Sequence, residues 1–197
     1  MKNLIAVIIV IAALAFGAFK YINSFVALDE NVNAKWSQVL NQYKRRAELV
    51  PNLVETVKGY AAHEQKIFED VANARSKSMQ ASVDASGLSD EAKMKEFMTA
   101  QSSFGLALGR LMAVSENYPE LKANQNFLSL QSQLEGTQNR ISVAMHDYIE
   151  AVKEYNVALR SFPNKFIVSA FYPELKPKQN LEISNDEKIN PKVSFEK

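Results

Sequence analysis

The sequence predicts an all-α protein with an N-terminal transmembrane helix, followed by an antiparallel bundle of long helices that pack like coiled coils. Three observations indicate this class. The 197 residues include only six glycines and six prolines, about 6% against a usual ~12%, and these are too few turn-formers for a β-sandwich or barrel. The chain begins with an uninterrupted apolar run. The rest of the sequence repeats its apolar residues at helical spacing.

The first element is the apolar run Leu4–Phe19, sixteen residues without a charged side chain. At about 1.5 Å per residue the run is about 24 Å long, shorter than the ~30 Å hydrocarbon core of a bilayer. The amine of Lys20 can reach the headgroups and Tyr21 suits the interface, so the predicted span extends over Leu4–Ile22. Residues 1–28 therefore form the predicted membrane anchor.

Two other interpretations of this run stay open. A cleaved signal peptide would use Ala13-Leu14-Ala15 as its cleavage site, and a soluble protein would bury the run as a core helix. A retained anchor is favoured because apolar residues continue past that site to Phe25 and Leu28. Lys2 before the run and Lys20 after it nearly balance, and the very short basic N-terminus favours a domain on the non-cytoplasmic side.

From Asp29 onward the apolar residues form one stripe on a helix. Its members are Val32, Trp36, Val39, Tyr43, Ala47 and Val50, then Val54, Val57, Ala61, Phe68 and Val71. Pro51 cannot donate a hydrogen bond to the carbonyl of Ala47, so a kink or a break is expected there. Because the stripe keeps its phase across Pro51, the sequence favours one kinked helix over about Asp29–Gln80. The alternative is a break at Pro51, which would make four long helices instead of three.

Two further long helices follow the loop Ser82–Ser89, in which Ser89 is the expected N-cap of the first. That helix runs to about Glu116 on the stripe Met94, Phe97, Gln101, Phe104, Leu108, Leu111 and Ser115. The second covers about Asn124–Ser161, and its stripe extends from Phe127 to Phe162.

Short connections make neighbouring helices antiparallel, so residues 29–163 form the predicted bundle. Residues 164–197 comprise a short apolar segment and a mostly extended or disordered tail. The apolar segment is expected to pack either on one end of the bundle or on lipid.

Composition and motifs exclude several functions. A net charge of +1 argues against a nucleic-acid partner, and the absence of cysteine removes thiolate chemistry. His63-Glu64 would begin a zinc-protease motif, but Ile67 stands where the second histidine is needed. Phosphate-binding glycine loops are absent from the sequence as well. We therefore predict a protein that is not an enzyme, with no catalytic residue, metal or cofactor.

A family resemblance is carried by a set of short motifs. They are Trp36–Val39, Arg45–Ala61, His63-Glu64, Tyr118–Asn124, Leu134–Ile141, Tyr155-Asn156 and Ser161–Pro163. Together these motifs closely resemble the LemA family over about residues 21–163. The chain departs from the family at Gln138, where the family usually has Glu, and at Met145–Ile149, which replaces an Arg-rich stretch.

The resemblance implies a bacterial single-pass protein of the inner membrane, with an N-terminal anchor and a long-helix bundle. We expect a non-enzymatic scaffold or interaction protein of the cell envelope. Its expected partners are the bilayer, through Leu4–Ile22, and other membrane or envelope proteins. The polar motif positions that knit the helices together or form a partner surface are Arg45, Arg46, Asn52, His63, Glu64, Arg75, Glu135, Asn139 and Arg140.

Two alternatives from other classes stay open. A ligand-binding or enzymatic module would have a polar pocket between helices around Arg46, Glu64 and Arg140. A membrane-organising protein would act through homo-oligomers of the long bundle.

Overall fold

The computed structural model describes residues 2–181, except for the side chains of residues 2–8, 10–23 and 171. The described residues form helices and no strand, which confirms the all-α class. The elements are α1 (Lys2–Lys58), α2 (Gln65–Gln80), the 3-10 helix η1 (Ala85–Ser89), α3 (Glu91–Ser115), α4 (Pro119–Lys122), α5 (Gln125–Arg160) and α6 (Asn164–Phe171).

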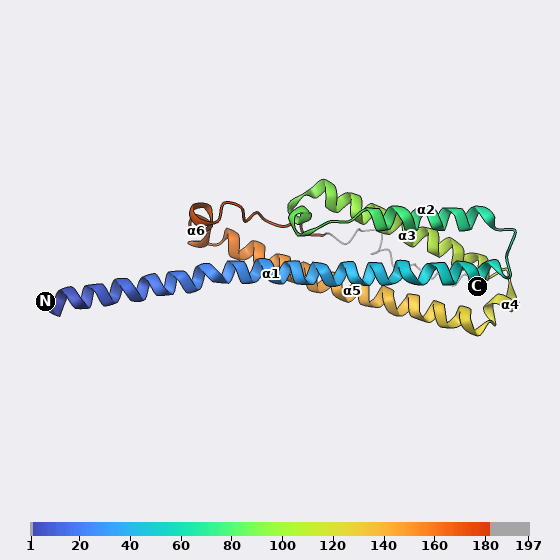
Figure 1. The fold of residues 1–197 in the computed structure, drawn as a ribbon, viewed down its shortest axis with the longest axis horizontal. Helices are drawn as coiled ribbons and strands as arrows, with labels where there is room; N and C mark the ends of the chain where they lie inside the picture. Colours follow the sequence, from blue (N-terminus) through green and yellow to red (C-terminus); the bar gives the residue numbers. More distant parts are fainter. Residues whose placement is uncertain (1, 182–197) are drawn as a thin grey trace, which may run out of the picture.

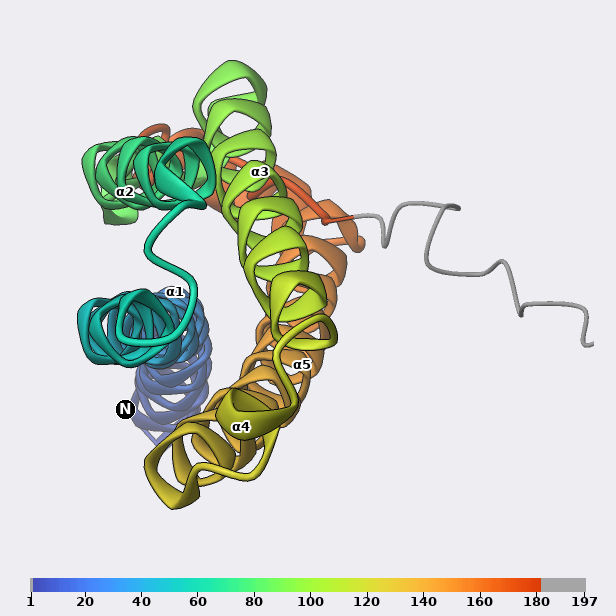
Figure 2. The same cartoon turned by 90° about the vertical axis from the view of Figure 1, so that its right-hand side faces the viewer.

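The bundle consists of two antiparallel helix pairs, α1 with α5 and α2 with α3 (Figure 1). Seen along its length, α1, α2, α3 and α5 surround a common axis (Figure 2). α4 is a single turn that connects α3 to α5 at one end, while α6 follows α5 at the other end. The N-terminal part of α1 projects beyond the end that carries α6 (Figure 1).

Contacts along α1 and α5, and just beyond one end of the pair, define the register of the two helices. Lys35 binds Asp147, Trp36 contacts Tyr148 and Arg46 binds Gln138, and at the far end Tyr60 binds Asn124. The two positions in each pair add up to 182–184. Residue n of α1 therefore lies level with about residue 184 − n of α5 along the whole bundle.

The expectation of one helix over Asp29–Gln80 is wrong. α1 continues through Pro51 and ends at Lys58, and the chain turns at residues 59–64 before α2 runs back. Pro51 is exposed, and a proline in a helix interior costs about 3 kcal/mol that long flanking helices can offset. Gly59 ends the helix because glycine gives up the most backbone freedom in a helical conformation. The four-helix alternative is therefore correct in number, but its break lies at Gly59.

The other predicted stripes are largely confirmed. All seven stripe positions of α3 are buried, although Asp90 rather than Ser89 caps this helix by accepting from the backbone N–H groups of Ala92 and Lys93. The α5 stripe is mostly buried, but its last position, Phe162, is 84% exposed. α5 ends at Arg160, so helical spacing no longer places Phe162 against the core.

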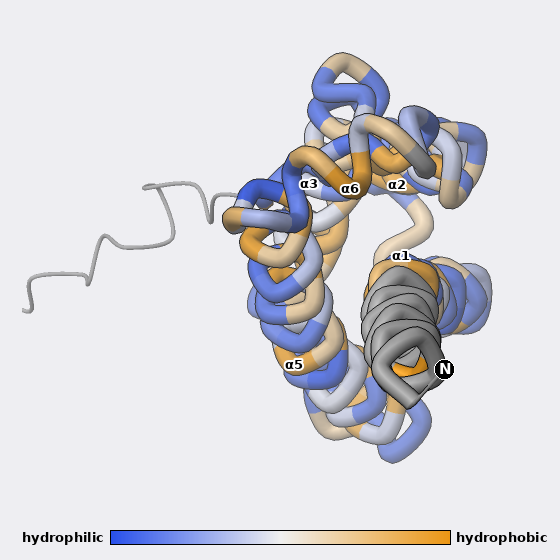
Figure 3. Tube along the Cα trace, turned by 90° about the vertical axis from the view of Figure 1, so that its left-hand side faces the viewer, coloured by the Kyte–Doolittle hydropathy of each residue, from blue (hydrophilic) through white to orange (hydrophobic). Residues whose placement is uncertain are grey.

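Apolar side chains form two clusters along the bundle. The first surrounds Trp36, whose ring packs against Phe97 and Tyr148 and whose Nε1 donates to the carbonyl of Val83 at 2.6 Å. The second includes Phe104, Leu111, Leu121 and Phe127. Hydrophilic and hydrophobic residues both occur along each long helix (Figure 3), as expected for helices that each bury one face.

After α6 the chain runs back along the bundle as an extended segment, residues 173–181, which we call the strap. Asn156 binds the strap twice: its Nδ2 donates to the carbonyl of Lys178, and its Oδ1 accepts from the Lys178 N–H, both at 2.9 Å. The ammonium of Lys178 also lies 3.0 Å from the carboxylate of Asp29 in α1. The strap thus ties α5 to α1. The remaining tail, residues 182–197, lies outside the described residues.

No helix in the described part of the chain combines the length and the apolarity needed to cross a membrane. The predicted span Leu4–Ile22 is unconfirmed. Its backbone belongs to α1, and all of its side chains except that of Ile9 lie outside the described residues. Ile9 is 62% exposed.

Candidate functional site

The most connected polar position is Arg46, which is 7% exposed and lies where the two apolar clusters meet. One terminal nitrogen donates to Oε1 of Gln101 at 2.9 Å and to the Gln101 carbonyl at 3.2 Å, while the other donates to Oε1 of Gln138 at 3.3 Å. The guanidinium also stacks 5.0 Å from the Tyr43 ring centroid and 5.2 Å from that of Phe104. A single side chain of α1 therefore contacts α3 and α5 at once.

Gln101 extends this junction to a fourth helix. Its Nε2 donates to the carbonyl of Ser78 in α2 at 3.0 Å while its Oε1 accepts from Arg46. Gln101 is a polar residue on the predicted core stripe of α3, and both ends of its amide have partners. We call Arg46, Gln101 and Gln138 the arginine junction.

The arginine junction is electrostatically unusual because the groups that accept hydrogen bonds from Arg46 are neutral. Burial lowers the pKa of Arg46 below its ordinary range, and the electrostatic effect of Tyr43 opposes this shift. Its Nε is buried without a hydrogen-bond partner among the described residues. A buried cation held by amides and aromatic rings can position the helices that carry them. It is not suited to proton transfer, because arginine stays protonated.

Arg75 is a second arginine that joins two helices by a hydrogen bond. Its Nε donates to the carbonyl of Ala47 at 2.7 Å, across from α2 to α1. Ala47 is the residue whose carbonyl would accept from position 51 in an uninterrupted helix, and Pro51 has no N–H to donate. Arg75 therefore supplies the donor that Pro51 lacks, which explains how α1 continues through a proline.

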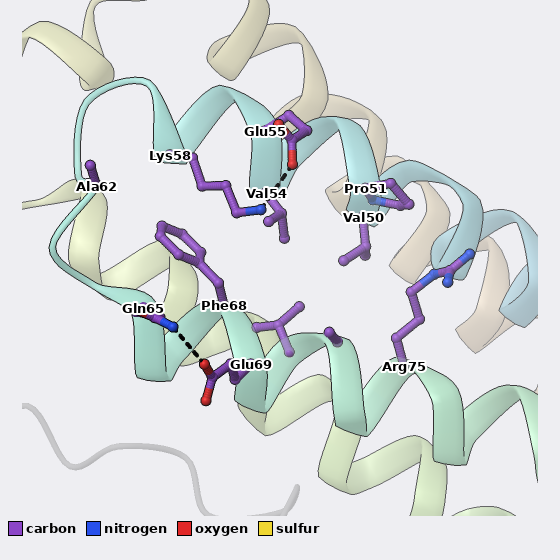
Figure 4. Close-up of a pocket in the computed structure, with 12 residues that line it drawn as sticks. Val50, Pro51, Val54, Glu55, Lys58, Ala62, Gln65, Phe68, Glu69 and Arg75 are labelled. Atoms are coloured by element: carbon purple, nitrogen blue, oxygen red, sulfur yellow. Dashed lines mark hydrogen bonds and ion pairs between the residues drawn. The ribbon is translucent and has the colours of Figure 1, made fainter.

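A groove of about 650 Å³ lies between α1 and α2 beside this contact (Figure 4). Its walls are mostly apolar, with Val50, Pro51 and Val54 on α1 and Phe68 on α2. Polar groups at its rim pair with each other: Lys58 lies 3.0 Å from Glu55, and Gln65 donates to Glu69 at 3.0 Å. The groove thus presents apolar surface and no pair of free acid and base groups.

The other motif positions lie on the outside of the bundle or at its turn. Arg45, Asn52, His63, Glu135, Asn139 and Arg140 are exposed, and Glu64 is half-buried just before α2. Glu135 accepts from Gln131 at 3.1 Å, and Arg140 donates to the hydroxyl of Thr137 at 3.1 Å. By the α1–α5 register, Arg45 is level with Asn139 and Arg140, so these three exposed side chains share one height of the bundle.

Arg46, Glu64 and Arg140, the positions of the predicted inter-helix pocket, face different surroundings. Arg46 points into the core, whereas Arg140 lies two positions, or about 200°, beyond Gln138 on α5 and is exposed. Glu64 comes after the end of α1. That end lies twelve residues after Arg46, and therefore about 18 Å from it along the helix axis. Within the described residues no group of three or more His, Cys, Asp or Glu side chains is arranged to hold a metal ion.

Sequence reasoning missed the group that holds the strap. Burial raises the pKa of the Tyr155 hydroxyl, with a further contribution from Asp29, and this hydroxyl donates to the Lys176 carbonyl at 3.2 Å. The only sequence signal was the Tyr155-Asn156 motif, which does not reveal that its partners are strap backbone groups more than twenty residues away.

Comparison with known proteins identifies the class to which this bundle belongs. A family model described as the LemA family matches residues 35–195, which include α1 from Lys35 onward, the rest of the bundle, α6 and the strap. The chain belongs to the LemA family, as its motifs predicted.

Its relatives include proteins that are named as magnetosome proteins. The chain is 30% identical over 179 residues to magnetosome protein MamQ 2 of Paramagnetospirillum magneticum, covering 83% of this chain and 65% of that protein. It is 29% identical over 157 residues to magnetosome protein MamQ of Magnetospirillum gryphiswaldense, covering 72% and 58% respectively. The chain thus matches somewhat less than two thirds of the length of these relatives.

Proposed function

We propose that this protein is a membrane-tethered, non-enzymatic scaffold of the bacterial cell envelope. The observation that carries the proposal is the continuity of α1, which runs without a break from Lys2 into the bundle. The apolar run Leu4–Phe19 therefore belongs to the same helix as core residues such as Trp36. A continuous helix of this kind holds a bundle at a defined height above a membrane.

The polar motif residues support a scaffold rather than an enzyme. Arg46 and Arg75 use their donors to join helices. The remaining motif positions are spread over the outer surface, where Arg45, Asn139 and Arg140 share one height. We propose this outer surface as the region that binds another envelope protein on the non-cytoplasmic side.

The membrane tether is tested by alkaline carbonate extraction of membranes from a bacterium that produces the full chain. We expect the chain to stay in the membrane pellet and to be released by detergent. A variant without residues 2–22 retains core residues from Phe25 onward and should move to the soluble fraction. Release of the full chain by carbonate would overturn the tether.

The side of the membrane is tested with a single introduced thiol, because the chain contains no cysteine. Val143→Cys lies on α5 at a site that is 63% exposed. A membrane-impermeant maleimide should label it in spheroplasts without lysis. Labelling that requires lysis would place the bundle in the cytoplasm and contradict this part of the proposal.

The partner surface is tested by cross-linking in intact cells followed by purification of the full chain. Replacing Arg45 and Arg140 by Glu should reduce recovery of the cross-linked partner severalfold, whereas the matched exposed change Lys95→Glu on α3 should not. Because the two relatives are named as magnetosome proteins, a magnetosome-forming host is a suitable second setting, in which co-purification with magnetosomes would support a shared role. Equal recovery from both variants would count against this surface.

A further inference from the structure

Two exposed phenylalanines lie at the junction of α5 and α6. Phe162 is 84% exposed and Phe166 is 66% exposed, and their rings form an edge-to-face pair with centroids 6.1 Å apart. Aromatic rings left in water cost free energy in proportion to their apolar area, and a paired group of them marks a surface that is covered by something else.

The α1–α5 register gives the height of this aromatic pair. Phe25 of α1 is level with Leu159 of α5, and both belong to the first apolar cluster together with Val168 of α6. By the same register Arg160, the last residue of α5, is level with about Ser24, and Phe162 follows two residues later in the turn, near the height of Ile22. Ile22 is the last residue of the predicted membrane span, so the exposed pair lies at the height where that span leaves the bilayer.

Charged residues around the pair fit a lipid surface. Between residues 160 and 176 the chain carries Arg160, Lys165 and Lys176 against a single acidic residue, Glu174. Arg160 and Lys165 are exposed on either side of Phe162. Basic side chains beside aromatic rings are the combination found where proteins meet anionic headgroups and the edge of the hydrocarbon core.

α6 is held firmly enough to present this surface. Asn164, which is 6% exposed, donates from Nδ2 to the carbonyl of Ala158 at 2.8 Å, and Val168 faces the core. Phe166 lies between these two buried positions in sequence and points away from the bundle. The helix thus buries one side and leaves an aromatic and basic side free.

We propose that the turn before α6 and α6 itself rest on the bilayer, with Phe162 and Phe166 inserted at the headgroup boundary and Arg160 and Lys165 against anionic lipid. This proposal rests on the membrane tether proposed above and adds a second attachment. One helix crossing a membrane leaves the bundle free to tilt. A second contact at the same height fixes its orientation.

The test uses the full chain in vesicles of phosphatidylcholine and phosphatidylglycerol, with a fluorophore on a single introduced cysteine. Phe162→Cys and Phe166→Cys report on the proposed contact, and Val143→Cys is the matched control because it is similarly exposed, at 63%, but lies farther along α5. A quencher attached to the lipid chains should reduce fluorescence at 162 and 166 about threefold and leave that at 143 nearly unchanged.

Two results would overturn the proposal. Equal quenching at 143 and 166 would show that α6 does not touch lipid. Protection of 166 from water without lipid quenching would show that protein covers the pair. If carbonate releases the chain from membranes, the tether itself fails; if the chain stays and 166 is unquenched, only this inference fails.

A second variant avoids the label. Replacing both phenylalanines by serine should leave the chain in the carbonate-resistant pellet and raise the rate of trypsin cleavage at Arg160 and Lys165 in vesicles about threefold. In detergent the serine variant and the parent should be cleaved at similar rates. Equal rates in vesicles would contradict the proposal.

Discussion

The Nε of Arg75 donates to the carbonyl oxygen of Ala47 at 2.7 Å, and this carbonyl is the one that Pro51 leaves without its helical donor. The contact joins α2 to α1 at the position where the sequence raised the expectation of a kink. A side chain from another helix thus completes the hydrogen bonding of α1 and so allows its continuity from Lys2 to Lys58.

Replacing Arg75 by Met should destabilise the bundle by about 1–2 kcal/mol, because the half-buried Ala47 carbonyl loses its donor. In a Pro51→Ala background the same change should cost about 0.5 kcal/mol or less, since position 51 then donates within the helix. Denaturant unfolding of the full chain in detergent, followed by circular dichroism, measures this cycle. Equal costs in both backgrounds would refute the link between Arg75 and Pro51.

Gln138→Glu should stabilise the protein by about 1 kcal/mol, because a carboxylate would replace the amide that accepts from Arg46 at 3.3 Å. Arg46 would depress the folded pKa of the new Glu, so the gain should be present above the unfolded pKa of about 4.3 and disappear as pH falls through the folded value. The free energy of unfolding at pH 7 and at pH 3 measures this gain. Gln133→Glu on the exposed face of α5 is the control.

Asp147 makes an acid-sensitive link between α5 and α1. Its hydrogen bond and ion pair with Lys35, at 2.9 Å, hold the pKa of the carboxyl below its ordinary value of 3.8. The contribution to stability is therefore complete above that value and is lost as pH falls through the folded pKa. Asp147→Asn should reduce the acid-induced loss of stability. An unchanged pH profile would argue against the link, and Glu96→Gln on α3 serves as the control.

Asn156→Ala should free the strap, because it removes both hydrogen bonds to the backbone of Lys178. At about 1 kcal/mol per bond, the cost is about 2 kcal/mol. Limited proteolysis with trypsin should then cut after Lys178 faster while the bundle stays intact. Glu154→Ala, an exposed change on the same helix, should leave the cleavage rate unchanged.

The local sequence pattern was sufficient to predict the all-α class, the apolar stripes and most helix ends. Each apolar stripe records which face of a helix must leave water, and this follows from residue spacing alone. The stripe of α3 was correct at every position. The stripe of α5 failed at Phe162, because spacing carries no information once the helix has ended.

The sequence by itself determined the all-α class, the apolar stripe of α3 and membership of the LemA family, because these depend on composition, periodicity and local motifs. Tertiary structure alone decided that α1 passes through Pro51, that Arg46 meets Gln101 and Gln138, and that Phe162 remains exposed beside Phe166. Each of these features depends on partners that lie 24 or more residues away, or on where packing stops. A one-dimensional pattern contains neither the distance between helices nor the atoms that complete an unpaired donor or acceptor.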